Sequence, residues 1–138
     1  MGRQYIEEAR GRTALVRLAV QQGLWAATVR AAQECVELFL KGSLRLVAVE
    51  PTRTHDVADV LRRERARFPD WFRQAVDELA TISTELAGDR GIAFYGDERQ
   101  ELGPQELFEE SDARRAVQKL EVVARFCDRL LSESPPSP

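Results

Sequence analysis

The feature that most constrains this fold is a sustained helical spacing of apolar residues between positions 25 and 47. The apolar positions recur every three or four residues, at Trp25, Val29, Ala32, Val36, Phe39, Ser43 or Leu44, and Val47. This spacing places them on one face of a helix, and charged residues such as Glu37 occupy the other faces. It predicts an amphipathic helix over residues 24–49, which Pro51 ends by interrupting the backbone hydrogen bonds.

Four further segments carry helical patterns. They cover residues 3–22, 56–65, 69–88 and about 111–131, and Gly23 supplies the turn that stops the first of them. In the first segment, Leu15 and Leu18 are expected to widen the buried stripe. No segment shows sustained strand alternation, and no repeat is visible. The sequence therefore predicts an all-α, up-and-down bundle of four long helices and one short helix, with residues 1–131 as one domain and 132–138 as a disordered tail.

Length and charge limit the classes of function. A chain of 138 residues is long enough for one hydrophobic core without disulfides or metal. Its net charge of −3 argues against a domain whose whole surface binds nucleic acid. Apolar runs fall short of the roughly 20 residues that cross a bilayer. Cys35 and Cys127 each lie in an apolar stripe, so we expect buried free thiols in a cytoplasmic protein.

The only histidine, His55, follows the predicted end of the second helix, where Thr54 or Asp56 can cap the next helix. One interpretation is that His55 fixes this turn by a hydrogen bond to a carbonyl or carboxylate. The other is that His55, together with Lys41 and Arg45, faces a cleft and contacts an anionic ligand. Both interpretations remain open from the sequence.

Residues 89–111 form a long connection without periodicity, which is more often functional than purely structural. Arg90, Tyr95 and Asp97 in this segment combine aromatic surface with charge. Such a mixture suits a nucleotide base and ribose, and it equally suits a loop that packs its own aromatic residues on the bundle.

The sequence carries no signature of a metal site, of a phosphate-binding loop or of a catalytic nucleophile. One histidine and two distant cysteines supply no metal-ligand cluster, and no phosphate-binding glycine loop or nucleophile elbow occurs. A basic run, Arg62, Arg63, Arg65 and Arg67, could hold a phosphate, but its interposed acidic residues favour a solvated helix end.

Several motifs, taken in order, resemble the HEPN domain (higher eukaryotes and prokaryotes nucleotide-binding). They are AAQECVELFLKGSLRL, followed by EPTRTHDVADVL, then GIAFYGDE and ESDARRAVQKLEVVARFCDRLL. The likeness covers Tyr5 to Leu131, which is almost the whole chain. It implies the helical bundle that the periodicity predicts.

The resemblance also implies a function. Small HEPN proteins pair with a minimal nucleotidyltransferase in a toxin–antitoxin manner, and they bind its nucleotide or become its substrate. HEPN domains commonly form homodimers, and the small residues of the second helix, including Ala27 and Gly42, would allow close helix contact. The ligand residues that this interpretation selects are Lys41, Arg45, His55, Asp56, Arg90, Tyr95 and Asp97.

Many members of the family resemble metal-independent ribonucleases that use an R-x(4–6)-H motif. Relative to His55, the arginine would have to stand at Ala48, Val49 or Glu50, so this motif is absent. We therefore expect a non-catalytic protein that needs no cofactor. A ribonuclease toxin and a purely structural oligomerisation module are the two alternatives.

Overall fold

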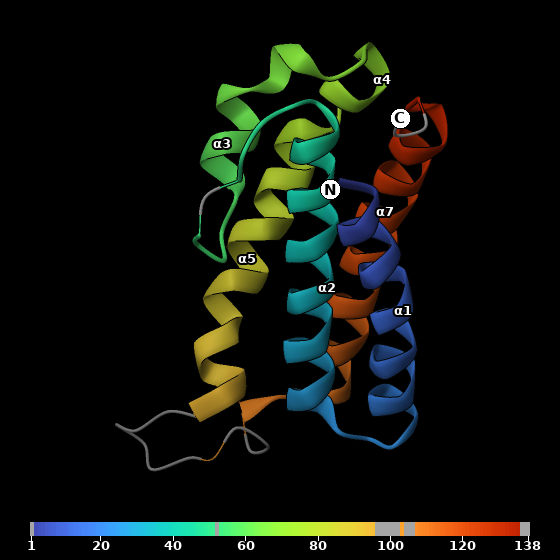
Figure 1. Ribbon diagram of the computed structural model, residues 1–138. Helices are drawn as coiled ribbons and strands as arrows, with labels where there is room; N and C mark the ends of the chain where they lie inside the picture. Colours follow the sequence, from blue (N-terminus) through green and yellow to red (C-terminus); the bar gives the residue numbers. More distant parts are fainter. Residues whose placement is uncertain (1, 52, 96–102, 104–106, 136–138) are drawn as a thin grey trace.

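The computed structural model describes residues 2–51, 53–95, 103 and 107–135, with residues 90–95 described by their backbone. Over these residues the chain forms six α-helices and one 3-10 turn, and no strand. The four long helices are α1 (Gly2–Gln21), α2 (Trp25–Leu46), α5 (Val76–Tyr95) and α7 (Glu110–Glu133). Three short elements, α3 (Ala58–Arg63), η1 (Arg65–Arg67) and α4 (Asp70–Arg73), join α2 to α5. The predicted all-α bundle is confirmed (Figure 1).

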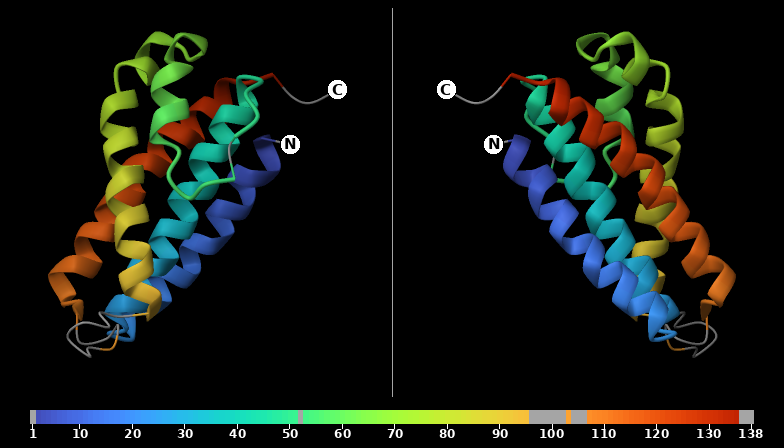
Figure 2. Two further views of the ribbon diagram at one scale, coloured as in Figure 1. Left: turned by 90° about the vertical axis from the view of Figure 1, so that its left-hand side faces the viewer. Right: turned by 90° about the vertical axis from the view of Figure 1, so that its right-hand side faces the viewer.

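Helix α2 is the central helix of the bundle. It packs against α1, α5 and α7, whereas α5 and α7 contact each other sparingly. The two further views show the long helices running along the length of the molecule (Figure 2). The stripe predicted for α2 is buried, with Val29, Val36, Phe39 and Leu44 each at most 2% exposed. One continuous core therefore surrounds this helix.

The turn between α1 and α2 forms as the sequence predicts. Gly23 has a φ of 72°, a left-handed conformation that glycine adopts without a Cβ penalty. Three residues therefore suffice to reverse the chain, and α1 and α2 become antiparallel neighbours.

Helix α2 ends earlier than expected, at Leu46 and not at Val49. Ala48 takes a left-handed φ of 63°, and the backbone N–H of Val49 donates to the Leu44 carbonyl at 2.9 Å. Val49 is 9% exposed, so this reversal returns an apolar side chain to the core. The left-handed residue Ala48 thus ends the helix before the chain reaches Pro51.

The segment after α3 also differs from expectation. Pro69 does precede a helix, but α4 ends at Arg73, and α5 starts at Val76 after a short turn. At its other end α5 continues through Gly88 to Tyr95. A glycine inside a helix costs only about 1 kcal/mol relative to alanine, which did not suffice to end this one.

The prediction for Leu15 and Leu18 is wrong. Their side chains are 58% and 53% exposed, because the buried face of α1 follows Ile6, Ala9 and Val16. Leu24, in the turn before α2, is 49% exposed. The predicted tail lies partly outside the described residues, since residues 136–138 are not described.

Candidate functional site

The histidine predicted for a turn does lie in a cleft, and a carboxylate of α2 holds it there. Nδ1 of His55 lies 2.6 Å from Oε1 of Glu37, in the middle of α2. Glu37 also pairs with Lys41 Nζ at 3.3 Å and accepts a hydrogen bond from Gln33 Nε2 at 3.2 Å. Glu37 is therefore the common partner of two predicted ligand residues, Lys41 and His55, and it takes up part of their hydrogen-bonding capacity.

The cleft beside His55 has a volume of about 200 Å³. It is lined by Arg12, Glu34, Glu37, Leu38 and His55. Arg12 comes from α1 and is paired with Glu8 at 3.0 Å and with Glu34 at 3.6 Å. Two carboxylates thus face one arginine across a small cleft, and the positive charge of that arginine is already neutralised.

No pattern in the sequence predicts Arg12 as a neighbour of His55. The two residues meet only because α1 and α2 are antiparallel and the segment after α2 folds back along it. No motif spacing encodes that tertiary arrangement.

Arg45 makes a separate set of contacts. Its guanidinium pairs with Glu50 at 2.8 Å and lies 4.7 Å from the centre of the Tyr5 ring. The side chain is 14% exposed, and its Nε is buried without a hydrogen-bond partner among the described residues. Arg45 is not part of the lining of the His55 cleft, so the structure does not join it to that site.

Asp56 has a structural position. Its Oδ1 accepts hydrogen bonds from the backbone N–H of Ala58 at 2.9 Å and from Ser83 Oγ at 3.0 Å. Its Oδ2 accepts from Thr84 Oγ1 at 2.9 Å, and Ser83 Oγ in turn accepts from the Val57 N–H. Asp56 therefore accepts from the first backbone N–H of α3, although the N-cap residue itself is Val57, and it ties this segment to the middle of α5.

The remaining predicted ligand residues are distant or not described. Arg90 and Tyr95 belong to the last turns of α5, not to a loop as expected. At 1.5 Å per residue they lie about 9 and 17 Å further along the helix axis than Thr84. Asp97 lies outside the described residues. Among the predicted residues whose side chains the structure describes, only Lys41 and His55 share a carboxylate.

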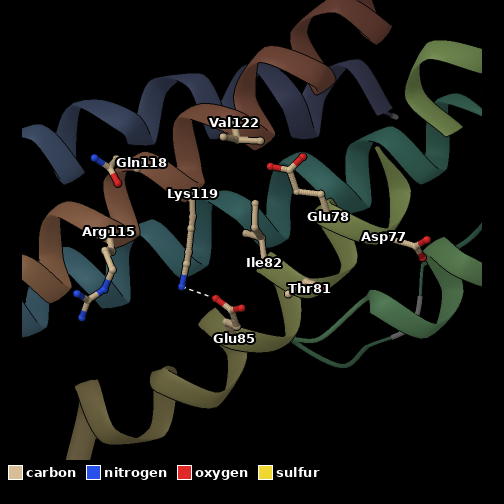
Figure 3. A pocket seen from close by; sticks show the side chains of 9 residues that line it. All are labelled: Asp77, Glu78, Thr81, Ile82, Glu85, Arg115, Gln118, Lys119 and Val122. Atoms are coloured by element: carbon tan, nitrogen blue, oxygen red, sulfur yellow. Dashed lines mark ion pairs between the residues drawn. The ribbon is translucent and has the colours of Figure 1, made fainter. Parts of the chain in front are cut away.

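A second cavity, larger than the His55 cleft, is one that the sequence did not indicate. It lies between α5 and α7 and has a volume of about 550 Å³ (Figure 3). Its lining residues are Asp77, Glu78, Thr81, Ile82, Glu85, Arg115, Gln118, Lys119 and Val122. Lys119 Nζ bridges to Glu85 at 2.5 Å, as the dashed line in Figure 3 shows. The groove thus combines an apolar floor at Ile82 and Val122 with charged side chains on both helices.

The basic run at the end of α3 and in η1 has internal partners. Arg65 and Arg62 bind Asp77 at 2.9 and 3.4 Å, and these two arginines hold the pKa of Asp77 below its usual range. Glu64 pairs with Arg67 and Arg63. All four arginines therefore have a carboxylate neighbour, which agrees with a solvated helix end.

The two cysteines are buried and free, as predicted. Burial raises the pKa of Cys35 and of Cys127 to about 12. Both thiols stay protonated at neutral pH, and a protonated, enclosed thiol is a poor nucleophile and a poor metal ligand. The described residues contain no group of three or more side chains suited to a metal ion.

Within the described residues, every helix is too short or too polar to pass through a lipid bilayer. Comparison with curated proteins and comparison with solved structures return no match. A protein-family model does match, that of the HEPN domain, over residues 3–130. This match spans nearly all of the chain and coincides with the helical bundle described above, so the chain belongs to the HEPN domain family.

Proposed function

We propose that this HEPN protein is a non-catalytic, nucleotide-binding regulatory partner of a minimal nucleotidyltransferase, in a toxin–antitoxin-like pair. The observation that carries the proposal is the state of His55. This histidine, the only one in the chain, is bonded to Glu37 beside a second carboxylate, Glu34. Two carboxylates repel an approaching phosphodiester, and the neighbouring Arg12 and Lys41 are already paired. The cleft is therefore poorly suited to cutting RNA.

The surface of α1 supports a role in binding another protein. Leu15 and Leu18 lie one helical turn apart on α1, and Leu24 lies in the connection between α1 and α2. Each of the three is about half exposed. Large exposed apolar side chains that lie close together often mark a protein interface. This surface would serve the nucleotidyltransferase or a second copy of the chain.

Co-expression with the nucleotidyltransferase encoded in a neighbouring reading frame tests the proposal. We expect the two proteins to elute as one complex in size-exclusion chromatography. We also expect intact-mass measurement to find nucleotide bound to this chain, covalently or not. The proposal is rejected if the two proteins elute separately and no nucleotide is found on this chain.

A matched pair of variants locates the interface. Leu15→Gln with Leu18→Gln should weaken the complex about tenfold or more while leaving the melting temperature nearly unchanged, because both side chains are exposed. Arg17→Gln, at an exposed position between them, is the control and should bind as the unmodified protein does.

A metal-independent ribonuclease is the second candidate, because Arg12 and His55 line one cleft and Glu37 could orient the imidazole for proton transfer. Under our proposal, the purified protein does not cleave RNA in the presence of a chelator. Cleavage that is lost in both His55→Ala and Arg12→Gln would overturn the non-catalytic assignment and establish this alternative.

A further inference from the structure

A third cavity lies near the end of the bundle that carries α4, away from the His55 cleft. Its volume is about 360 Å³, and it is lined by Trp71 of α4 and by Arg125, Phe126 and Arg129 of α7. Figure 1 shows α4 and the C-terminal end of α7 at the same end of the molecule. Neither the motifs of the sequence nor the proposed function assigns a role to this cavity.

The aromatic wall of this cavity is held in place on several sides. The Trp71 and Phe126 rings are nearly parallel, at 17°, with their centres 6.2 Å apart, and Phe72 meets both rings edge-on. The indole N–H of Trp71 donates to Glu133 at 2.9 Å. A planar ligand would therefore find a stacking surface that is already ordered.

Arg129 covers one face of the Trp71 ring. Its guanidinium lies 4.0 Å from the centre of the Trp71 ring and is held by Glu133 at 3.2 Å. A guanidinium plane is itself a surface on which aromatic rings and nucleobases stack. Trp71 and Arg129 thus form a stacked platform, fixed through their shared partner Glu133, and the outer layer of this platform is the guanidinium.

Arg125 supplies a positive charge that its own helix does not neutralise. Arg114, Arg115 and Arg129, the other arginines of α7, pair with Glu110, Asp112 and Glu133. Arg125 forms no ion pair with any described residue, although Glu121 stands one helical turn before it. An exposed guanidinium at the edge of a cavity is well suited to a phosphate group.

The combination restricts the ligand. A cation is disfavoured by two guanidinium groups, and a long nucleic acid by the net charge of −3. A volume of about 360 Å³ suits a small molecule. We propose that this cavity binds a planar aromatic ring carrying a phosphate, with the ring on the Trp71–Arg129 platform and the phosphate on Arg125. This site does not depend on the proposed function above.

Tryptophan fluorescence tests the inference, because the chain has only two tryptophans, Trp25 and Trp71. In a Trp25→Phe background the signal comes from Trp71 alone. We expect saturable quenching by adenosine monophosphate, guanosine monophosphate or phenyl phosphate. Adenosine and inorganic phosphate, each lacking one half of the ligand, should bind at least about tenfold more weakly.

Arg125→Gln should raise the Kd for the phosphorylated rings about tenfold or more, without unfolding the protein, since the side chain is exposed. Arg17→Gln, an exposed arginine on α1, is the control and should leave the Kd within about twofold.

The three phosphorylated probes also separate the sources of the ligand. Tighter binding of the two nucleotides than of phenyl phosphate supports the inference and assigns the site to nucleotides, whereas equal binding supports a site for phosphorylated rings in general. No saturable quenching, a Kd indifferent to Arg125→Gln, or inorganic phosphate binding as tightly as the nucleotides would overturn the inference.

Discussion

Two helix contacts in this bundle differ sharply, the one between α1 and α2 and the one between α5 and α7. At the first, glycine brings the backbones together. A Cβ placed on Gly42 would lie 2.8 Å from Cγ1 of Ile6 and 3.0 Å from the carbonyl oxygen of Gly2. At the second, a cavity of about 550 Å³ separates the helices, and the Lys119–Glu85 ion pair crosses it.

The difference shows how residue type sets the distance between helices. Where glycines face each other, the two backbones come into van der Waals contact, and no room remains for a ligand. Where long charged side chains face each other, they keep their charges in water and leave a groove between their stems. In this protein α1 and α2 form the closed contact, while α5 and α7 form the open one.

The largest expected effect comes from Gly42→Ala, which places a methyl group in the closed contact. Alanine favours a helix over glycine by about 1 kcal/mol, but the clash with Ile6 and with the Gly2 backbone should outweigh this gain. We expect the free energy of unfolding to fall by about 1 to 3 kcal/mol in urea titrations.

Gly11→Ala is the matched control for this prediction. Gly11 also lies inside a helix, α1, but nothing lies within 4 Å of where its Cβ would be. Here alanine should stabilise the protein, by up to about 1 kcal/mol. Two identical substitutions should thus act with opposite sign, and equal effects would show that the α1–α2 contact is looser than described.

A smaller effect is expected where α3 packs on α5, outside the α5–α7 groove. Asp56 ties the start of α3 to Ser83 and Thr84 of α5. Asp56→Ala therefore removes the acceptor of the first N–H of α3 and leaves the Ser83 hydroxyl, which is 3% exposed, with fewer partners. We expect a loss of about 1 to 2 kcal/mol in the free energy of unfolding.

Asp56→Asn is the informative comparison, because its amide oxygen can still accept from Ala58 and Ser83 while its NH₂ group can donate to Thr84. This variant should recover most of the lost stability. If it were as unstable as Asp56→Ala, the negative charge and not the hydrogen-bond geometry would hold α3 on α5.

The sequence was sufficient for features that depend on local spacing. The apolar face of α2, the turn at Gly23, the hydrogen bond from the first N–H of α3 to Asp56 and the burial of Cys35 and Cys127 all follow from periodicity or from backbone chemistry. Leu15 and Leu18 were misplaced because periodicity alone does not say how wide the covered face of a helix is. That width depends on how many neighbours pack on the helix.

The candidate site was less predictable than the fold. Lys41 and Arg45 are one turn apart on α2, yet Lys41 turns to Glu37 while Arg45 lies against Tyr5 and Glu50. Long flexible side chains choose their partners by tertiary contacts that spacing does not reveal. For the same reason neither the Arg12 side of the His55 cleft nor the α5–α7 groove could be read from the sequence.

The smallest expected effects come from two aspartates of α5 whose pKa values shift in opposite directions. Partial burial raises the pKa of Asp89, although Lys119 nearby opposes the shift. The stability that Asp89 contributes is therefore present below its unfolded pKa and is lost as the pH rises through its folded value. Asp89→Asn should thus be more stable than the unmodified protein at neutral pH, and the difference should vanish in acid.

Asp77, which lines the α5–α7 groove, should behave in the opposite way. Arg65 and Arg62 lower its pKa, so its contribution is present above the unfolded pKa, about 3.9, and is lost as the pH falls through the folded value. Asp77→Asn should be less stable than the unmodified protein at neutral pH and equal to it in strong acid. Urea unfolding between pH 3 and 7 measures, for each variant, the slope against pH of its difference in unfolding free energy from the unmodified protein. Slopes of the same sign would mean that the charges around the open groove are arranged differently from those described.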